Sequence, residues 1–134
     1  KPDYVVLLQP TCPLRDSKYI DSAFEFYFQK EKEGYDSCFS AFSLGTTHAK
    51  WKILHDGKAL GLYDYRTRPR RQDTDEHYQM VCENGAFYAL KYDTMFEAGD
   101  FIGYNPAIYL TPRVIDIDTE EDILCIEKQL TEKN

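Results

Sequence analysis

Two aspartates, Asp116 and Asp118, close the apolar run over residues 114–118. Side chains at positions i and i+2 of a β-strand point to the same face, with Cβ atoms about 7 Å apart. Two carboxylates placed in this way can bind one hard cation, and Mg²⁺ prefers one or two carboxylates completed by water and phosphate oxygens. The pair therefore predicts a magnesium site. The alternative is an acidic strand end in an acidic protein.

A second group with chemical potential follows the apolar run 4–8. Gln9 and Thr11 offer hydrogen bonds in a segment that Pro10 and Pro13 stiffen. Open α/β sheets bind ligands at the carboxyl ends of their strands. This segment is a candidate ligand loop, or else a rigid connection with Arg15 on the surface.

Basic side chains form a third group. Arginine and lysine recognise phosphate and carboxylate groups, arginine often through two parallel hydrogen bonds. The candidates are Lys50, Lys52, Arg68, Arg70, Arg71 and the polar Gln72. The group is either an anion site or a solvated loop that neutralises nearby acids.

A fourth group begins at the Asn84-Gly85 pair. Glycine allows close backbone approach there, and Asn84 and Tyr88 supply polar tips. An ordinary strand entry is the competing interpretation.

The elements that must position these groups alternate between strands and helices, which predicts an α/β fold. Strands are expected over residues 4–8, 36–42, 86–90, 101–104, 108–110 and 114–118, with a hairpin over 51–62. Helices are expected from Asp16 or Ser17 to Gly34, over 94–98, and from a capping-box variant at Thr119 to Thr131. The continuous apolar run 4–8 is typical of a strand buried on both faces of a parallel sheet. With the next helix and strand it would form a right-handed βαβ unit.

Bulk properties restrict the class of protein. The chain has 134 residues, enough for a single domain over residues 1–134, and a net charge of −7, which disfavours nucleic acid and anionic membranes as partners. Its four cysteines are widely spaced, which favours reduced thiols in a cytoplasmic protein. Neither a membrane span nor a signal peptide is recognisable in the sequence.

Four segments, taken in this order, resemble the acylneuraminate cytidylyltransferases, or CMP-sialic acid synthetases. They read LQPTCPLR (8–15), PRRQ (69–72), NGAFY (84–88) and DIDTEED (116–122). The resemblance implies a Rossmann-like nucleotide-sugar transferase fold, with a mostly parallel sheet flanked by helices and a β-hairpin dimerisation extension. It also implies transfer of CMP from CTP to a sialic-acid-like nine-carbon keto-sugar acid, with release of pyrophosphate.

The resemblance assigns roles to individual residues. Asp116 and Asp118 would bind Mg²⁺ and, with Gln9, form the catalytic group. The substrate-binding set would comprise Gln9, Thr11, Lys50, Arg70, Asn84, Tyr88 and Phe101. Phe101 falls in a segment that, in this family, reaches into the partner subunit's site, which implies a homodimer.

Two departures from the family pattern matter. The glycine-rich loop that grips the triphosphate in this family has no counterpart here, so we expect this stretch alone to be inactive and to lack the family's N-terminal part. An arginine often found before the Asn-Gly pair is replaced by Cys82 or Glu83. Pseudaminic or legionaminic acid is therefore an alternative to N-acylneuraminate. The sequence is also compatible with a Kdo cytidylyltransferase and with a non-catalytic binding or dimerisation module.

Overall fold

The structure is a computed structural model that describes residues 1–45, 50–67 and 80–132. Its chain divides into two compact units. Residues 1–42 and 83–134 form the first unit, and residues 43–82 form the second. The predicted single domain over residues 1–134 remains a prediction.

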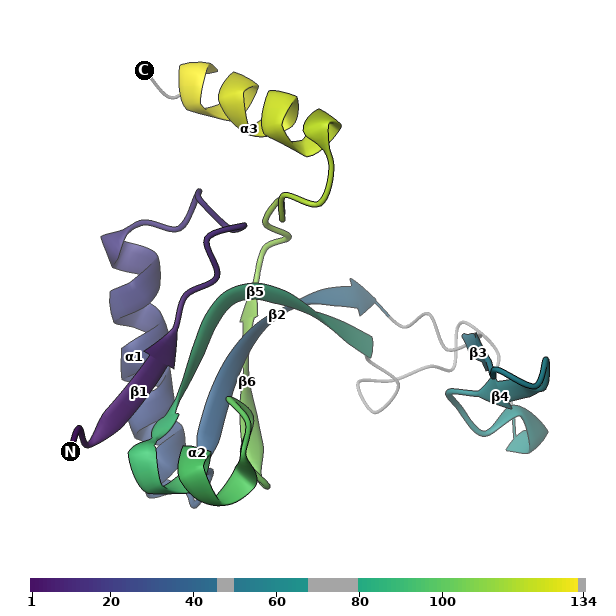
Figure 1. The fold of residues 1–134 in the computed structure, drawn as a ribbon, viewed down its shortest axis with the longest axis horizontal. Helices are drawn as coiled ribbons and strands as arrows, with labels where there is room; N and C mark the ends of the chain where they lie inside the picture. The colour runs from purple at the N-terminus through teal and green to yellow at the C-terminus, as the bar shows by residue number, and fades with distance from the viewer. Residues whose placement is uncertain (46–49, 68–79, 133–134) are drawn as a thin grey trace. The chain divides into compact units, whose positions relative to one another are not determined.

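A mixed sheet of four strands organises the first unit. The strands lie in the order β1 (Tyr4–Leu7), β5 (Met80–Lys91), β2 (Ser37–Gly45) and β6 (Pro106–Thr111). β1 pairs antiparallel with β5, whereas β2 pairs parallel with β6. β5 lies next to β2, and the two strands run in opposite directions (Figure 1). The predicted mostly parallel sheet is therefore not observed: β5 separates β1 from β2, and most of the pairing is antiparallel.

Helix α1 (Ser17–Lys32) packs against this sheet. The Asp16 carboxylate accepts a hydrogen bond from the backbone N–H of Tyr19 at 2.8 Å, which caps the helix as predicted. Ala23 and Tyr27 lie on its buried face. With side chains from β2, β5 and β6 they form the core: Ala23, Tyr27, Cys38, Phe87, Ala89 and Ala107.

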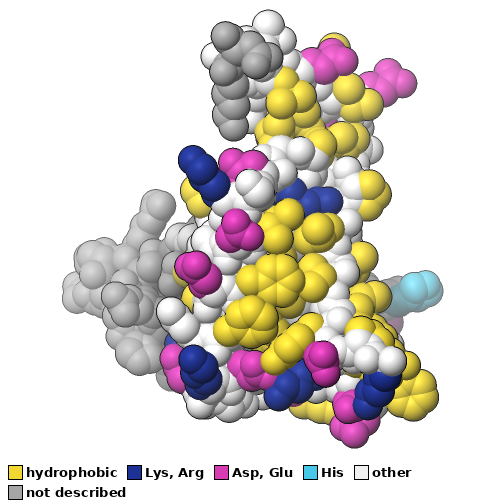
Figure 2. Space-filling model, turned by 90° about the vertical axis from the view of Figure 1, so that its left-hand side faces the viewer, with side chains coloured by type: hydrophobic (Ala, Val, Ile, Leu, Met, Phe, Trp, Pro, Cys, Tyr) yellow, Lys and Arg dark blue, Asp and Glu magenta, His cyan; other side chains and the backbone are white. Residues whose placement is uncertain are grey.

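Strand β1 is less buried than its composition predicts. All four of its residues are half-buried, and β1 is an edge strand among the described residues. Figure 2, which views the side of the molecule that carries α1 and β1, shows hydrophobic side chains gathered at the surface. The continuous apolar run therefore does not correspond to a central strand in this chain.

Helix α2 (Tyr92–Ala98) is where the sequence predicts a short helix, but no strand forms over residues 101–104. The side chains of Asp36, just before β2, and Ser37, its first residue, accept hydrogen bonds from the backbone N–H groups of this segment. The N–H groups of Tyr104 and Asn105 donate to the Asp36 carboxylate at 2.8 and 3.0 Å, and that of Gly103 donates to the Ser37 hydroxyl at 2.9 Å. The segment is a turn that leads into β6.

The predicted strand over residues 114–118 is also absent, because no strand lies beside it in the described part of the chain. It is followed by helix α3 (Glu120–Glu132). The predicted capping box does form. Asp122 accepts hydrogen bonds from the N–H and hydroxyl of Thr119, both at 2.8 Å, and the Thr119 hydroxyl accepts from the Asp122 N–H at 3.3 Å.

The second unit contains the predicted hairpin. β3 (Trp51–Ile53) pairs antiparallel with β4 (Ala59–Gly61), and the short 3₁₀ helix η1 (Tyr65–Thr67) follows. Gly57 has a φ of 80°, which accounts for the Asp-Gly turn. None of the helices in the described ranges is long and apolar enough to cross a bilayer.

Candidate functional site

Three of the predicted segments meet at the carboxyl end of β1. The N–H of Gln9 donates to the carbonyl oxygen of Gly85 at 3.3 Å, and the N–H of Ile117 donates to that of Thr11 at 2.9 Å. Loop 9–15, the middle of β5 and segment 114–118 are thereby held together. We call the side chains at this junction the carboxyl-end cluster: Gln9, Cys12, Glu83, Tyr88, Asp116 and Asp118.

Arg15 fixes the shape of loop 9–15. Its guanidinium donates to the carbonyl oxygens of Gln9 and Cys12 at 2.6 and 2.8 Å. Two charge-assisted hydrogen bonds within one loop, together with its prolines, leave the backbone little freedom. Arg15 therefore stabilises the candidate ligand loop rather than standing free on the surface.

Gly85 lets the loop approach β5 closely. Its φ is 66°, in the left-handed region, and a Cβ atom built there would lie 2.1 Å from Oε1 of Gln9. Any other residue would adopt a strained backbone and displace the Gln9 amide. Gly85 therefore sets the position of a predicted catalytic side chain.

Cys12 joins the three segments in the interior. Its side chain is buried, with Sγ 2.8 Å from the Asn84 carbonyl oxygen and 3.6 Å from Oδ1 of Asp116. Burial, followed by the negative charge of Asp116, raises the pKa of this thiol to about 11. Cys12 is consequently a neutral hydrogen-bond donor near neutral pH and is unsuited to act as a nucleophile.

Asp116 lies beside this thiol, with its Oδ1 3.6 Å from Sγ. Asp118 follows Ile117, whose backbone N–H is bonded to the Thr11 carbonyl oxygen. The negative charges of both aspartates contribute to the raised pKa of Cys12. Asp116 is half-buried and Asp118 is exposed. Within the described ranges, no group of three or more His, Cys, Asp or Glu residues could hold a metal ion. Two carboxylates still match the donor set of a Mg²⁺ ion that takes its remaining ligands from water and substrate phosphates.

Asn84 has a different environment from the one predicted for a substrate-binding residue. It is 3% exposed. Its Oδ1 accepts from the Ser40 hydroxyl at 2.5 Å and from the Ala86 N–H at 3.2 Å, and its Nδ2 donates to the Thr111 hydroxyl at 2.9 Å. The Asn84 amide thus ties β5 to β2 and β6 beneath the cluster.

Tyr88 lies within the cluster and is almost fully buried. Its hydroxyl donates to Oε2 of Glu83 at 3.0 Å. Burial first, and then Glu83, raise the pKa of the phenol well above its usual value, so Tyr88 stays neutral. Tyr88 pairs with Leu7, the last residue of β1, just before loop 9–15 begins.

The predicted set also includes Lys50, Arg70 and Phe101. Lys50 is half-buried in the second unit, and its carbonyl oxygen accepts from the N–H of Leu62 at 2.9 Å. Arg70 lies outside the described residues. Phe101 follows α2, which begins beside the start of β1, so it lies at the opposite end of the sheet from the cluster within one copy of the chain.

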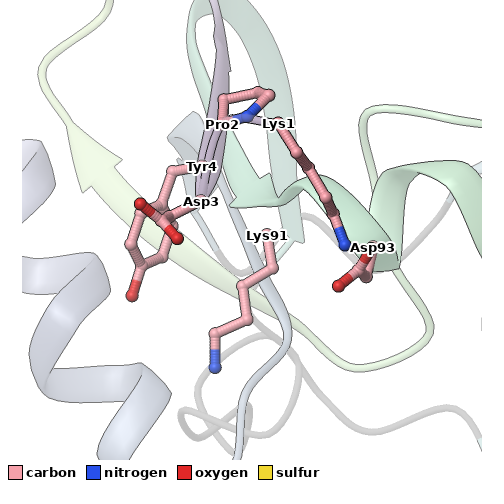
Figure 3. A pocket seen from close by; sticks show the side chains of 6 residues that line it. All are labelled: Lys1, Pro2, Asp3, Tyr4, Lys91 and Asp93. Carbon is pink, nitrogen blue, oxygen red and sulfur yellow. Dashed lines mark ion pairs between the residues drawn. The ribbon is translucent and has the colours of Figure 1, made fainter.

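Two of the hollows in the described part of the chain are lined by residues outside the cluster. A hollow of about 360 Å³ at the start of β1 is lined by Lys1, Pro2, Asp3, Tyr4, Lys91 and Asp93 (Figure 3). Its lysines are already paired, Lys1 with Asp93 and Lys91 with Glu31. An apolar hollow of about 620 Å³ is lined by Met95, Phe96, Gly99, Asp100 and Phe101.

Comparison with known proteins does not assign the chain to a family. No family model matches it, and no curated protein matches it significantly. Its function is therefore inferred from the residues and their geometry.

Glu83 and Cys12 belong to the cluster, although the sequence does not predict them as site residues. Cys12 lies inside a predicted ligand loop, but its burial depends on residues more than seventy positions away. One sequence signal could have indicated Glu83 as a site residue. The Asn84-Gly85 pair that follows it interrupts a strand pattern.

Proposed function

We propose that this chain is part of a cytidylyltransferase of the Rossmann-like nucleotide-sugar transferase type. It would transfer CMP from CTP to a sialic-acid-like nine-carbon keto-sugar acid in the cytoplasm, releasing pyrophosphate. The observation that carries the proposal is the meeting of three motif segments at one end of β1: loop 9–15, the Asn84-Gly85 pair and the segment that carries Asp116 and Asp118. These segments lie far apart in sequence, and their convergence is expected if they serve one reaction.

The chemistry requires positioning and charge neutralisation more than covalent catalysis. The anomeric hydroxyl of the sugar attacks the α-phosphorus of CTP, a new P–O bond forms, and the bond to the pyrophosphate leaving group breaks. A bound Mg²⁺ would offset phosphate charge and lower the pKa of the attacking hydroxyl. Asp116 and Asp118 supply the carboxylates that would hold this ion.

The other residues of the cluster would orient the reactants. The Gln9 amide, fixed against Gly85, presents a donor and an acceptor to sugar and nucleotide. Thr11 lies on the loop that Arg15 stiffens. Tyr88, a neutral and nearly buried phenol, would line the sugar site. Lys50 and Arg70 remain the candidates for the sugar carboxylate, and Asn84 would act mainly by holding β5 against β2 and β6.

Pyrophosphate release tests the proposal. The intact protein, incubated with CTP, Mg²⁺ and N-acylneuraminate, pseudaminic acid, legionaminic acid or Kdo, should release pyrophosphate with one of the nine-carbon sugars. Asp118→Asn should reduce kcat at least about 100-fold because one metal-binding charge is lost. Asp21→Asn, an exposed change on α1, is the control and should leave the rate unchanged.

Undiminished activity in Asp118→Asn would refute the metal role. CTP binding measured by calorimetry without pyrophosphate release, with every sugar tested, would instead support the alternative of a non-catalytic module.

We further propose that the active form is a homodimer assembled through the β3–β4 hairpin. Among the described residues of this unit, most of the large apolar side chains are exposed, including Trp51, Ile53, Leu60 and Leu62. A two-stranded hairpin is marginally stable by itself, so such a surface needs a partner. A second copy of the chain would cover these apolar side chains, and the dimer would contain a second Phe101.

A further inference from the structure

Asp116 and Asp118 lie two positions apart in a segment without strand structure, and hydrogen bonds restrain the backbone between them. The N–H of Ile117 donates to the Thr11 carbonyl oxygen at 2.9 Å, and the N–H of Asp118 donates to Oδ2 of Asp122 at 3.1 Å. These N–H groups belong to the two peptide planes on either side of the Ile117 Cα, and a peptide plane turns as one rigid unit. A loop contact restrains one plane, and a contact with α3 restrains the other. The spacing of the two aspartates therefore depends on both contacts.

Asp122 does more than cap helix α3. Its Oδ2 accepts hydrogen bonds from the N–H and the hydroxyl of Thr119, both at 2.8 Å, as a helix N-terminus requires. The same oxygen accepts from the Asp118 N–H, which lies outside the capping box formed by Thr119 and Asp122. An ionised oxygen that accepts three hydrogen bonds is held firmly in place. Asp122 thus ties the start of the helix to the backbone of Asp118.

The two aspartates differ in what holds them. Oδ1 of Asp116 lies 3.6 Å from Sγ of the buried Cys12, whereas Asp118 is exposed. A carboxylate on an exposed segment moves with the backbone that carries it, so a cation shared by the pair gains affinity when the Asp118 backbone is restrained beforehand. Groups that orient metal-binding carboxylates matter for this reason, and their loss commonly weakens metal binding about 10- to 100-fold.

We propose that Asp122 is a positioning residue, which directs Asp118 so that Asp116 and Asp118 can bind one divalent cation together. The inference rests on the proposed function, because the cation is the one that cytidylyl transfer requires. Asp122 acts on the cation through the backbone of Asp118 and not through its own charge, since its Oδ2 is engaged by three donors. An asparagine, which keeps an acceptor oxygen but carries no charge, should therefore replace it.

Titration of the intact protein with MnCl₂ alone, followed by electron paramagnetic resonance, measures cation binding without turnover, and Mn²⁺ takes the same oxygen ligands as Mg²⁺. Asp122→Ala should raise the Kd for Mn²⁺ about 10-fold or more, because the Asp118 N–H loses its acceptor. Asp122→Asn should stay within about 3-fold of the wild type, because an acceptor oxygen remains.

Thr119→Ala is the matched control. It removes the hydroxyl from the capping box but leaves the Asp118 N–H bonded to Asp122, so the Kd should stay within about 3-fold of the wild type. Thermal melting verifies that each variant folds.

The outcomes separate this inference from the proposed function. Equal Kd values for Asp122→Ala and the wild type would overturn the positioning role. So would an equal loss in Asp122→Asn, which would show that the charge itself binds the cation, or in Thr119→Ala, which would assign the effect to the start of α3 as a whole.

The wild-type protein supplies the remaining distinction. Failure to bind Mn²⁺ would overturn the role of Asp122, and pyrophosphate release by the same protein would leave the cytidylyl transfer standing. A protein that binds Mn²⁺ with the expected order of variants but never releases pyrophosphate would refute the transfer and support the role of Asp122 in binding the cation.

Discussion

Gly85 shows how one residue can serve both backbone and site. A side chain at this position would require a left-handed backbone and would collide with the Gln9 amide, whereas a Cβ atom at Gly34, which has a φ of 99°, would have nothing within 4 Å. The two glycines share the backbone requirement but differ in what surrounds them. A comparison of the two therefore isolates the effect of moving Gln9.

Gly85→Ala and Gly34→Ala should each lower the free energy of unfolding by about 1 kcal/mol, the usual cost of placing alanine in a left-handed conformation. Only Gly85→Ala should also reduce kcat/KM, by about 10-fold or more, because the Gln9 amide must move aside. Chemical denaturation and steady-state kinetics measure the two quantities. Equal kcat/KM for both variants would contradict the role of Gln9.

The sequence predicts the position of some residues of the site but not the environment of others. Residue type and motif order predict Asp116, Asp118, Gln9, Thr11 and Tyr88, and these residues do lie near the junction at the end of β1. The same reasoning predicts Asn84 as a ligand contact, but its amide is occupied by partners on β2 and β6. Those partners lie 44 and 27 positions away, a distance over which residue type alone gives no information.

At the scale of elements, Asn84 is the connection between strands. Its amide bonds to Ser40 on β2, Thr111 on β6 and the Ala86 N–H on β5 itself. Asn84→Ala would remove the side-chain acceptor of the Ala86 N–H and one of the two acceptors of the Ser40 hydroxyl, which keeps the Phe87 carbonyl oxygen at 3.3 Å. We therefore expect a loss of about 1–3 kcal/mol in the free energy of unfolding. Asn105→Ala removes an exposed amide bonded to the Gly34 carbonyl oxygen and should cost less than about 1 kcal/mol.

Denaturant unfolding of both variants measures this difference. A stable Asn84→Ala variant that has lost only substrate affinity would show instead that Asn84 contacts the ligand directly, as the resemblance implies.

Helices are predicted more accurately than strand pairing. α1, α2 and α3 follow from local caps and periodicity, whose determinants lie within a few residues. The position of β5 between β1 and β2 depends on contacts between distant segments, which an apolar run cannot encode. Residues 114–118 have strand composition, yet they make their backbone contact with loop 9–15 instead of a strand.

At the scale of the whole molecule, the exposed hairpin predicts self-association. Ile53 on β3 is 80% exposed and Leu124 on α3 is 65% exposed. Ile53→Asp should convert the dimer to monomers, because it places a charge in the proposed interface, whereas Leu124→Asp should leave the dimer intact. Sedimentation velocity distinguishes these states. A monomeric wild-type protein, or a dimer that survives Ile53→Asp, would contradict assembly through this unit.

The central claim is that the chain contributes to joining CMP to a sugar acid with the help of a divalent cation. Mass spectrometry of the products formed by the intact protein from CTP and each sugar acid tests it most directly. We predict a CMP–sugar adduct and equimolar pyrophosphate with a nine-carbon sugar, both abolished by EDTA and restored by excess Mg²⁺. Hydrolysis of CTP without an adduct, or an adduct that forms equally well in EDTA, would contradict it.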